Sequence, residues 1–321
     1  MIMIISLCLG QYPISLSEVG YQLTHFSQQN FSQQNSMASQ IIWSIRLPRI
    51  VMAFLAGSAL ALCGATLQGV FKNPLVDPHI IGVTSGSAFG GTLAILIGLN
   101  SYWMMTSTFG FGLLALGLIY LIAHFQGRDN TLVLILSGII LSGFFSALVS
   151  LMQFLADSED VLPSIVFWLL GSFATANWHK VLLMAAPIIS VSIILFKLRW
   201  RINLLAMDDK DAMRLGISIV QLRRVILICC AILVASQVAV SGSIAWVGLV
   251  VPHLGRLLVG SDHRRLLPVS FWLGGGFMMV VDDLARTLIQ SEIPIGIVTA
   301  LLGAPLFALL LIKSSNRHQI Q

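Results

Sequence analysis

The sequence predicts an all-α protein that crosses a membrane about ten times, and two observations lead to this fold class. Of its 321 residues, 57% are hydrophobic and only 10% are charged, and the mean hydropathy is +0.90. Soluble chains carry about 25% charged residues. The apolar residues also form nearly continuous runs, as at 132–141 and 181–196, unlike the alternating pattern of a membrane β-barrel. These features exclude a water-soluble enzyme and make membrane lipid the surrounding solvent.

The individual spans follow from the length that a bilayer requires, roughly 20 apolar residues. Residues 1–9 are apolar but too few to cross, so we interpret them as the end of a truncated first helix. Residues 10–40 are polar and repeat the motif FSQQN in tandem, which predicts a loop outside the hydrocarbon. With the truncated helix the count reaches ten, the others being expected at 43–70, 79–98, 103–124, 131–155, 181–198, 221–241, 246–259, 268–290 and 294–313.

Two apolar segments are shorter than a full span. The piece at 161–172 is too small to cross, and 246–259 is expected to be a half-helix packed against protein. The basic residues then set the orientation, because cytoplasmic loops collect Lys and Arg. With both termini in the cytoplasm, the 18 basic residues fall on the cytoplasmic side except for Arg46, Arg49, Lys180 and Arg286.

An internal repeat supports a transporter. Residues 75–87 and 249–261 agree at six of 13 positions, beginning with Leu-Val-Asp-Pro-His and Leu-Val-Val-Pro-His. In the expected topology the first copy starts on the cytoplasmic side and the second on the outer side. Such inverted repeats are typical of transporters. We expect residues 1–321 to form a single transmembrane domain.

The chain lacks the residues that would power transport directly. No Gly is followed by Lys, so a phosphate-binding loop is absent and ATP energy must come from a partner. The acids inside an apolar run are Asp282 and Asp283, and Asp282 is interpreted as an intrahelical partner of Arg286, four residues later. The four cysteines lie in apolar runs without metal-site spacing. We therefore expect no metal, no cofactor and no nucleic-acid partner.

Three motifs are candidates for interactions. Gly82, Gly86 and Gly90 share a helix face, which favours close helix packing. Arg46 and Arg49 share the outer start of a helix, where they either anchor at lipid headgroups or pair with carboxylates of a docking protein. The cytoplasmic loop at about 199–220 carries a short helix that packs on its own protein or docks in another subunit, with the candidate residues Asp208, Asp209, Ala212, Met213, Arg214, Leu215 and Gly216.

At this point the chain resembles a known family over about residues 10–313. In the first half the similar motifs are 46–49 (RLPR), 57–68 and 73–86. In the second half they are 242–253 (GSIAWVGLVVPH), 262–264, 283–286, 292–296 and 303–305, in the same order. They resemble the permease subunits of type II binding-protein-dependent ABC importers for ferric siderophores, haem and cobalamin, a family with a molybdate and tungstate branch.

The resemblance implies a ten-helix subunit of a bacterial or archaeal inner membrane. It implies a homodimer around a central pathway, two cytoplasmic ATP-binding subunits and a periplasmic or extracellular solute-binding protein. The residues matching Arg46, Arg49 and Arg286 meet acids of that binding protein, and the helix matching 208–216 transmits ATPase motion. The cytoplasmic gate is implied at about Asn130 and Thr131. Before the coupling helix, however, the family has Leu-Gly-Glu or Leu-Gly-Asp, where this chain has Ala206-Met207-Asp208-Asp209.

The leading hypothesis is therefore a transport subunit rather than an enzyme. It would move a metal-bearing solute by alternating access, with ATP hydrolysed by its partners. Iron chelates, haem and cobalamin are expected first by family frequency, and a molybdate or tungstate oxyanion next. The alternative is an ion-coupled secondary transporter or channel, against which the scarcity of charges within the spans argues.

Overall fold

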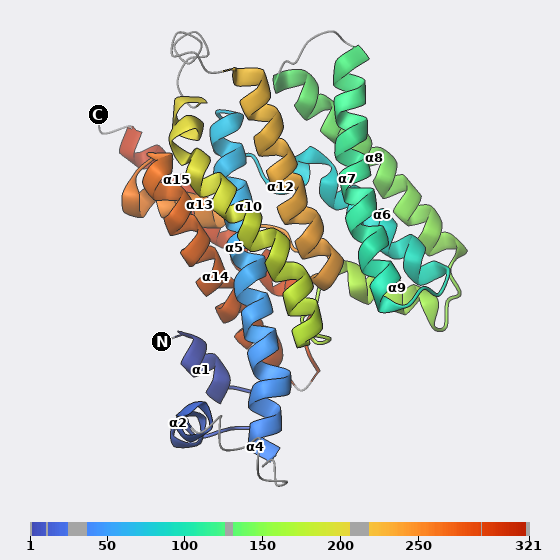
Figure 1. Ribbon diagram of the computed structural model, residues 1–321, viewed down its shortest axis with the longest axis vertical. Coiled ribbons are helices and arrows are strands. Elements are labelled where there is room, and N and C mark those ends of the chain that lie inside the picture. The colour runs from blue at the N-terminus through green and yellow to red at the C-terminus, as the bar shows by residue number, and fades with distance from the viewer. Residues whose placement is uncertain are drawn as a thin grey trace.

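The computed structural model describes residues 2–10, 12–24, 37–125, 131–205, 218–289 and 291–318, and every regular element in these ranges is a helix (Figure 1). This agrees with the all-α class that the apolar runs predict. Helices long and apolar enough to cross a membrane are 37–70, α7 (Ser101–Phe125), α8 (Thr131–Leu155), α10 (Trp178–Leu205), α12 (Ile219–Ser241) and α14 (His263–Thr287). Shorter apolar helices are α6 (Val83–Leu96), α13 (Val247–Val259) and α15 (Ile295–His318).

The helix at 37–70 begins earlier than the expected start near Trp43. It consists of α4 (Met37–Gln40), a π-helical turn η1 (Ile41–Arg46) and α5 (Leu47–Val70). Pro48 has no N–H with which to continue the hydrogen bonding of this helix, and the π-helical turn lies directly before it. The π-helical turn ends at Arg46, the first of the candidate docking arginines.

The polar segment 10–40 is not a simple loop, which corrects the prediction. It contains α2 (Leu16–Thr24), which follows α1 (Ile2–Cys8). The signal for α2 is a Ser15-x-x-Glu18 pattern, in which the Ser15 hydroxyl accepts a hydrogen bond from the backbone N–H of Glu18 at 3.3 Å. The short segments that remain are η2 (Pro78–Ile81) and α9 (Val161–Leu169), and α9 is too short to cross a bilayer, as expected.

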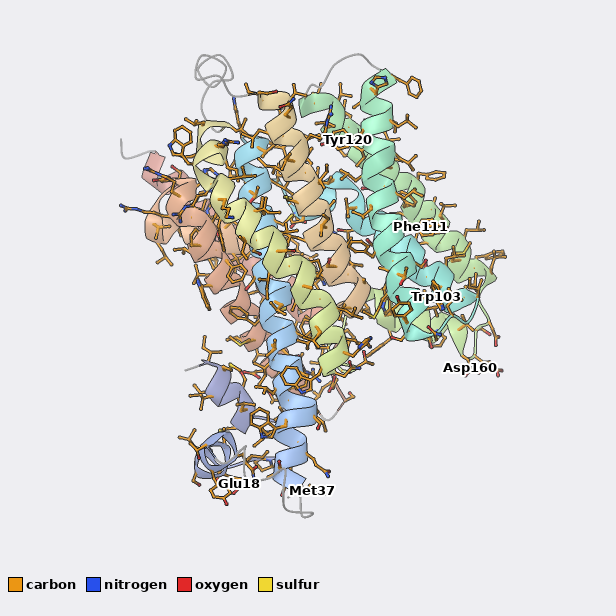
Figure 2. The ribbon with its side chains drawn as sticks, viewed as in Figure 1. Glu18, Met37, Trp103, Phe111, Tyr120 and Asp160 are labelled. Atoms are coloured by element: carbon orange, nitrogen blue, oxygen red, sulfur yellow. The ribbon has the colours of Figure 1, made fainter. Side chains whose placement is uncertain are left out.

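The bundle has two ends, which we name from Figure 1. At the lower end lie α1, α2 and the start of the 37–70 helix, which then rises through the bundle. Helix α7 also runs upward, with Trp103 near its lower end and Tyr120 higher (Figure 2). At the upper end Asp262 begins α14 by accepting a hydrogen bond from the backbone N–H of Arg264 at 3.0 Å, and hydrogen bonds from Arg264 lower the pKa of this partly exposed carboxyl.

Helix α5 is the central element of the bundle. It contacts α10, α12, α13 and α14, and nearly all of its side chains are buried. Two glycines allow neighbouring backbones to touch it: a methyl group on Gly57 would overlap the carbonyl oxygen of Gly274, and one on Gly64 would overlap that of Gly248. Larger residues at either position would therefore push α14 or α13 away from α5.

Candidate functional site

Charged side chains gather at the lower end, where the start of α5 meets the end of α14. Arg46 and Arg49 share one face of the helix at 37–70, and the acids Asp282 and Asp283 lie in the last turns of α14. The connection to α15 adds one more acid. We call this set the arginine–acid network, and its members are Arg46, Arg49, Asp282, Asp283, Arg286 and Glu292.

Arg49 is bound on both sides within the network. Its Nε donates to Oδ1 and Oδ2 of Asp282 at 3.0 and 3.1 Å, and its Nη2 donates to Oδ1 at 2.9 Å. Its Nη1 donates to Oε1 of Glu292 at 2.6 Å. Arg49 and Asp282 are buried, whereas the Glu292 side chain is 34% exposed. This bidentate geometry is the strongest form of an arginine–carboxylate contact.

The other two arginines hold the N-terminal segment in place. Arg286 pairs with Asp283 and donates to the carbonyl oxygen of Ser6 at 2.5 Å. The Ser6 hydroxyl in turn donates to Oδ2 of Asp283 at 2.5 Å. Arg46 donates to the carbonyl oxygens of Leu7, at 2.5 Å, and of Tyr12. The network thus joins α1 and the segment after it to α5 and α14.

The interpretation of Asp282 as the partner of Arg286 is incomplete. Arg286 Nε lies 3.9 Å from Oδ2 of Asp282, so the intrahelical ion pair exists. The closer partner, however, is Arg49 on another helix, 233 residues away in sequence. Spacing along one helix cannot reveal a contact of that separation. The Arg49–Glu292 pair and the Ser6–Asp283 hydrogen bond were missed for the same reason.

The network is balanced in charge. Its three arginines face three carboxylates, and all three arginines are buried. The lower end therefore does not present Arg46, Arg49 and Arg286 as a bare positive patch. The acid that is half-exposed, Glu292, is the member through which an outside molecule has most access to Arg49.

The glycines at 82, 86 and 90 lie at the beginning and along one side of α6. A Cβ on Gly86 would stand 2.6 Å from Ala115 Cβ, and one on Gly90 would stand 2.6 Å from the Ser107 carbonyl oxygen, both on α7. Gly82 differs: it has a φ of +72° and ends η2, and a Cβ there would stand 3.1 Å from the Gly138 carbonyl oxygen on α8. Two of the three glycines thus face α7 and the third faces α8.

The candidate gate and coupling residues fall mostly outside the described part of the chain. Asn130 lies in the gap before α8, and Thr131 is the first residue of that helix. The coupling residues Asp208, Asp209, Ala212, Met213, Arg214, Leu215 and Gly216 all lie in the gap between α10 and α12. The two helix ends that flank this gap are at the upper end of Figure 1.

A second feature is the interruption between α12 and α13. Trp246 has a φ of +73°, which is unusual for a residue with a side chain and indicates local strain. Its ring system packs against Gly303 on α15, where a Cβ would stand 2.7 Å from Trp246 Cβ. Nearby, the Gln68 side chain donates to the carbonyl oxygens of Val76, at 3.1 Å, and Gly248, at 3.3 Å. Side chains thus satisfy backbone groups where the helices break, as a membrane interior requires.

Two helices present broad apolar faces without charge. Helix α8 contains no charged residue, and α15 is uncharged until Lys313. Large side chains on both are exposed in the single chain, among them Leu136, Ile139, Ile140, Phe144, Leu301 and Leu309. Among the described residues no group of three or more His, Cys, Asp or Glu side chains is placed to hold a metal ion.

Comparison with known proteins gives one family. The sequence model of the FecCD transport family matches residues 1–313. The molybdate import system permease protein MolB of Haemophilus influenzae is 51% identical over 310 residues, which are 97% of this chain and 91% of that protein. A probable iron chelatin transport system permease protein of Helicobacter pylori is 38% identical over 283 residues, covering 88% and 86% of the two chains.

A solved structure has the same fold. The chain resembles a metal-chelate type ABC transporter in an inward-facing conformation, with a TM-score of 0.88 and 50% identity over 97% of this chain and 95% of that one.

Proposed function

The chain belongs to the FecCD transport family, and from this premise we propose that it imports an oxyanion of the molybdate class. As a family member it is the permease of an ABC importer, a multi-pass protein of the inner membrane without catalytic activity of its own. The observation that carries the substrate proposal is the 51% identity to a molybdate permease over nearly the full length of both chains. The iron chelatin relative reaches 38%.

The uncharged faces of α8 and α15 are compatible with this cargo. A pathway must bind its cargo weakly enough to release it, and an anion meets no fixed charge along these two helices before Lys313. Selectivity for the oxyanion would then reside in the solute-binding protein. We propose that two copies of the chain pair through these faces and that the pathway runs between them.

The proposed topology has ten spans with both termini in the cytoplasm. It makes the upper end of Figure 1 cytoplasmic, and it places Lys197, Arg199, Arg264 and Arg265 on that side. It is supported by the positive-inside rule. On this topology two ATP-binding subunits contact the segment 208–216, and the turn at Asn130 and Thr131 narrows the pathway on the cytoplasmic side.

The arginine–acid network then lies at the outer end and belongs to the docking surface of the solute-binding protein. Because Arg49 is already bound to Asp282 and Glu292, docking is proposed to work by exchange. An acid of the binding protein would replace Glu292, the half-exposed partner, on Arg49. The buried Arg49–Asp282 contact would stay intact.

The substrate proposal is tested with the cognate solute-binding protein by calorimetry, against molybdate, tungstate, a panel of ferric siderophores, haem and cobalamin. Selective binding of molybdate and tungstate is expected. Uptake into proteoliposomes that contain the permease and its ATPases should then require ATP inside and the loaded binding protein outside. Selective binding of a ferric siderophore would instead support the second candidate, import of an iron chelate, which the Helicobacter pylori relative favours. Uptake without the ATPases would support an ion-coupled carrier.

A further inference from the structure

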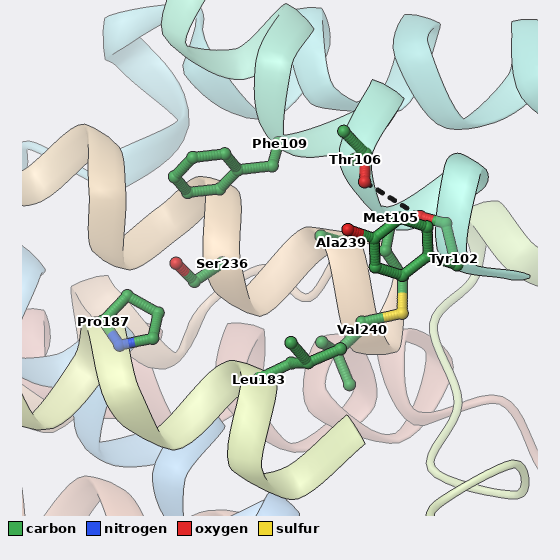
Figure 3. A pocket seen from close by; sticks show the side chains of 9 residues that line it. All are labelled: Tyr102, Met105, Thr106, Phe109, Leu183, Pro187, Ser236, Ala239 and Val240. Atoms are coloured by element: carbon green, nitrogen blue, oxygen red, sulfur yellow. Dashed lines mark hydrogen bonds between the residues drawn. The ribbon is translucent and has the colours of Figure 1, made fainter. Parts of the chain in front are cut away.

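Two adjoining hollows open at the lower end between α7 and α10. Both helices pack on α12, which forms the floor between them (Figure 3). The inner hollow has a volume of about 240 Å³, and the other, at the mouth, about 530 Å³. They share Tyr102, Met105 and Leu183 in their walls, so they lie next to each other, and we call the two together the groove.

The inner hollow is apolar. Besides the shared residues it is lined mainly by Phe109, Pro187, Ala239 and Val240 (Figure 3). Its two aliphatic hydroxyls are already used within their own helices: Ser236 donates to the Ile232 carbonyl oxygen at 2.6 Å, and Thr106 donates to that of Tyr102 at 3.0 Å. The hollow therefore suits a hydrocarbon chain and offers little to a polar ligand.

The mouth has the opposite character. Lys180 lies there, half-buried, with its ammonium group donating to Thr175 Oγ1 at 2.7 Å. Two of its three N–H donors remain for a ligand. At the lower end the three arginines are all occupied by carboxylates or carbonyl groups, whereas Lys180 makes no ion pair with any described residue. A cation without a carboxylate partner at the mouth of an apolar groove attracts an anion.

Two asparagines add donors beside Lys180. The Oδ1 atoms of Asn100 and Asn177 accept backbone hydrogen bonds at the starts of α7 and α10, at 3.1 and 2.9 Å. Each side-chain amide therefore keeps its NH₂ group as a donor. The positive ends of two long helices also meet at this mouth, which further favours negative charge.

We propose that this groove is a binding site for one anionic glycerophospholipid, with an acyl chain in the inner hollow and the phosphate beside Lys180. A free oxyanion would fill only the mouth and leave the apolar part empty. A zwitterionic phospholipid would also bring a phosphate to Lys180, but its cationic headgroup would be repelled by the lysine and by the two helix starts. The site follows from the groove and its charges alone. The proposed topology would place it in the outer leaflet, and only this placement rests on the proposed function.

Native mass spectrometry of the purified permease, titrated with phosphatidylglycerol or phosphatidylcholine, tests the proposal. We expect phosphatidylglycerol to bind about fivefold more tightly, the effect of one lysine near an anionic headgroup. Lys180→Gln should abolish that preference. Its matched control is Lys197→Gln, which changes the same charge at an exposed position of the same helix and should keep the preference.

The acyl-chain part is tested by filling the hollow. Ala239→Phe should weaken the binding of both lipids, whereas Leu182→Phe, at a 67% exposed position of α10, should not. Equal binding of the two lipids, or an unchanged preference in Lys180→Gln, would overturn the proposal even if Ala239→Phe failed to fold. Displacement of phosphatidylglycerol by inorganic phosphate would also overturn it, since the mouth would then be a free-anion site. None of these outcomes depends on which solute the permease imports.

Discussion

Arg49 and Asp282 lie 233 residues apart in sequence and are joined by three hydrogen bonds of 2.9–3.1 Å at the lower end of the bundle. The contact ties the start of α5 to the end of α14. Both side chains are almost completely buried. Removing Asp282 would leave the buried Arg49 with the half-exposed Glu292 as its remaining carboxylate, and breaking a buried ion pair in this way is strongly destabilising.

Asp282→Asn is therefore expected to destabilise the protein by about 3–5 kcal/mol. The double variant Arg49→Met with Asp282→Leu should recover most of that loss, because Glu292 is half-exposed to solvent and Arg286 keeps Asp283 as its partner. The measurement is the free energy of unfolding in mixed micelles. Glu159→Gln, an exposed carboxylate on the connection before α9, is the control and should change stability by less than about 0.5 kcal/mol. Equal losses in the single and double variants would show that the pair is not coupled.

Glu292→Gln should strengthen docking of the solute-binding protein. It removes the half-exposed carboxylate that competes for Arg49 Nη1. The free energy of docking should therefore become more favourable by on the order of 1 kcal/mol when a carboxylate of the binding protein pairs with Arg49. The check is the docking affinity measured by surface plasmon resonance on nanodiscs, with Glu159→Gln as the control. Unchanged affinity would mean that the network only stabilises the helix ends. Reversing Arg49 itself is less informative, since a carboxylate there would face Asp282 and Glu292.

Gly86→Leu should disrupt the packing of α6 on α7. A Cβ at Gly86 already stands 2.6 Å from Ala115 Cβ and 2.8 Å from the Phe111 carbonyl oxygen, so overpacking is expected to cost at least about 1–3 kcal/mol. Gly117→Leu on α7, which meets nothing within 4 Å, is the matched control. The melting temperature in detergent distinguishes them. Equal melting temperatures would show that α6 and α7 readily separate to accept the side chain.

The helical spans were predictable because a bilayer imposes a length and an apolar composition on each. The expected 131–155 coincides with α8, and the expected half-helix at 246–259 is α13 at 247–259. The start of the 37–70 helix was predicted too late, because Ser39 and Gln40 look polar, although Ser39 is buried. The four-residue spacing within α14 predicted the contact of Asp282 with Arg286 but not its contact with Arg49, since pairing between helices depends on tertiary packing.

Leu215→Asp should uncouple ATP hydrolysis from transport. Leu215 is proposed to lie on the apolar stripe that docks in the ATPase, and a charge there would prevent the stripe from being buried. ATPase activity of the reconstituted complex should lose its stimulation by the loaded binding protein, while Leu215→Met should retain it. Normal stimulation in the Asp variant would exclude this segment as the coupling helix.

The backbone contacts of α5 restrict how the permease can move. Gly57 and Gly64 bring the chain of α5 directly onto Gly274 of α14 and Gly248 of α13, with no intervening side chain to rearrange. We therefore expect these three helices to move as one unit during a transport cycle, while the helices around them change position. Spin labels on α5 and α14 should report one distance in every state of the cycle, whereas a label on α8 should report at least two.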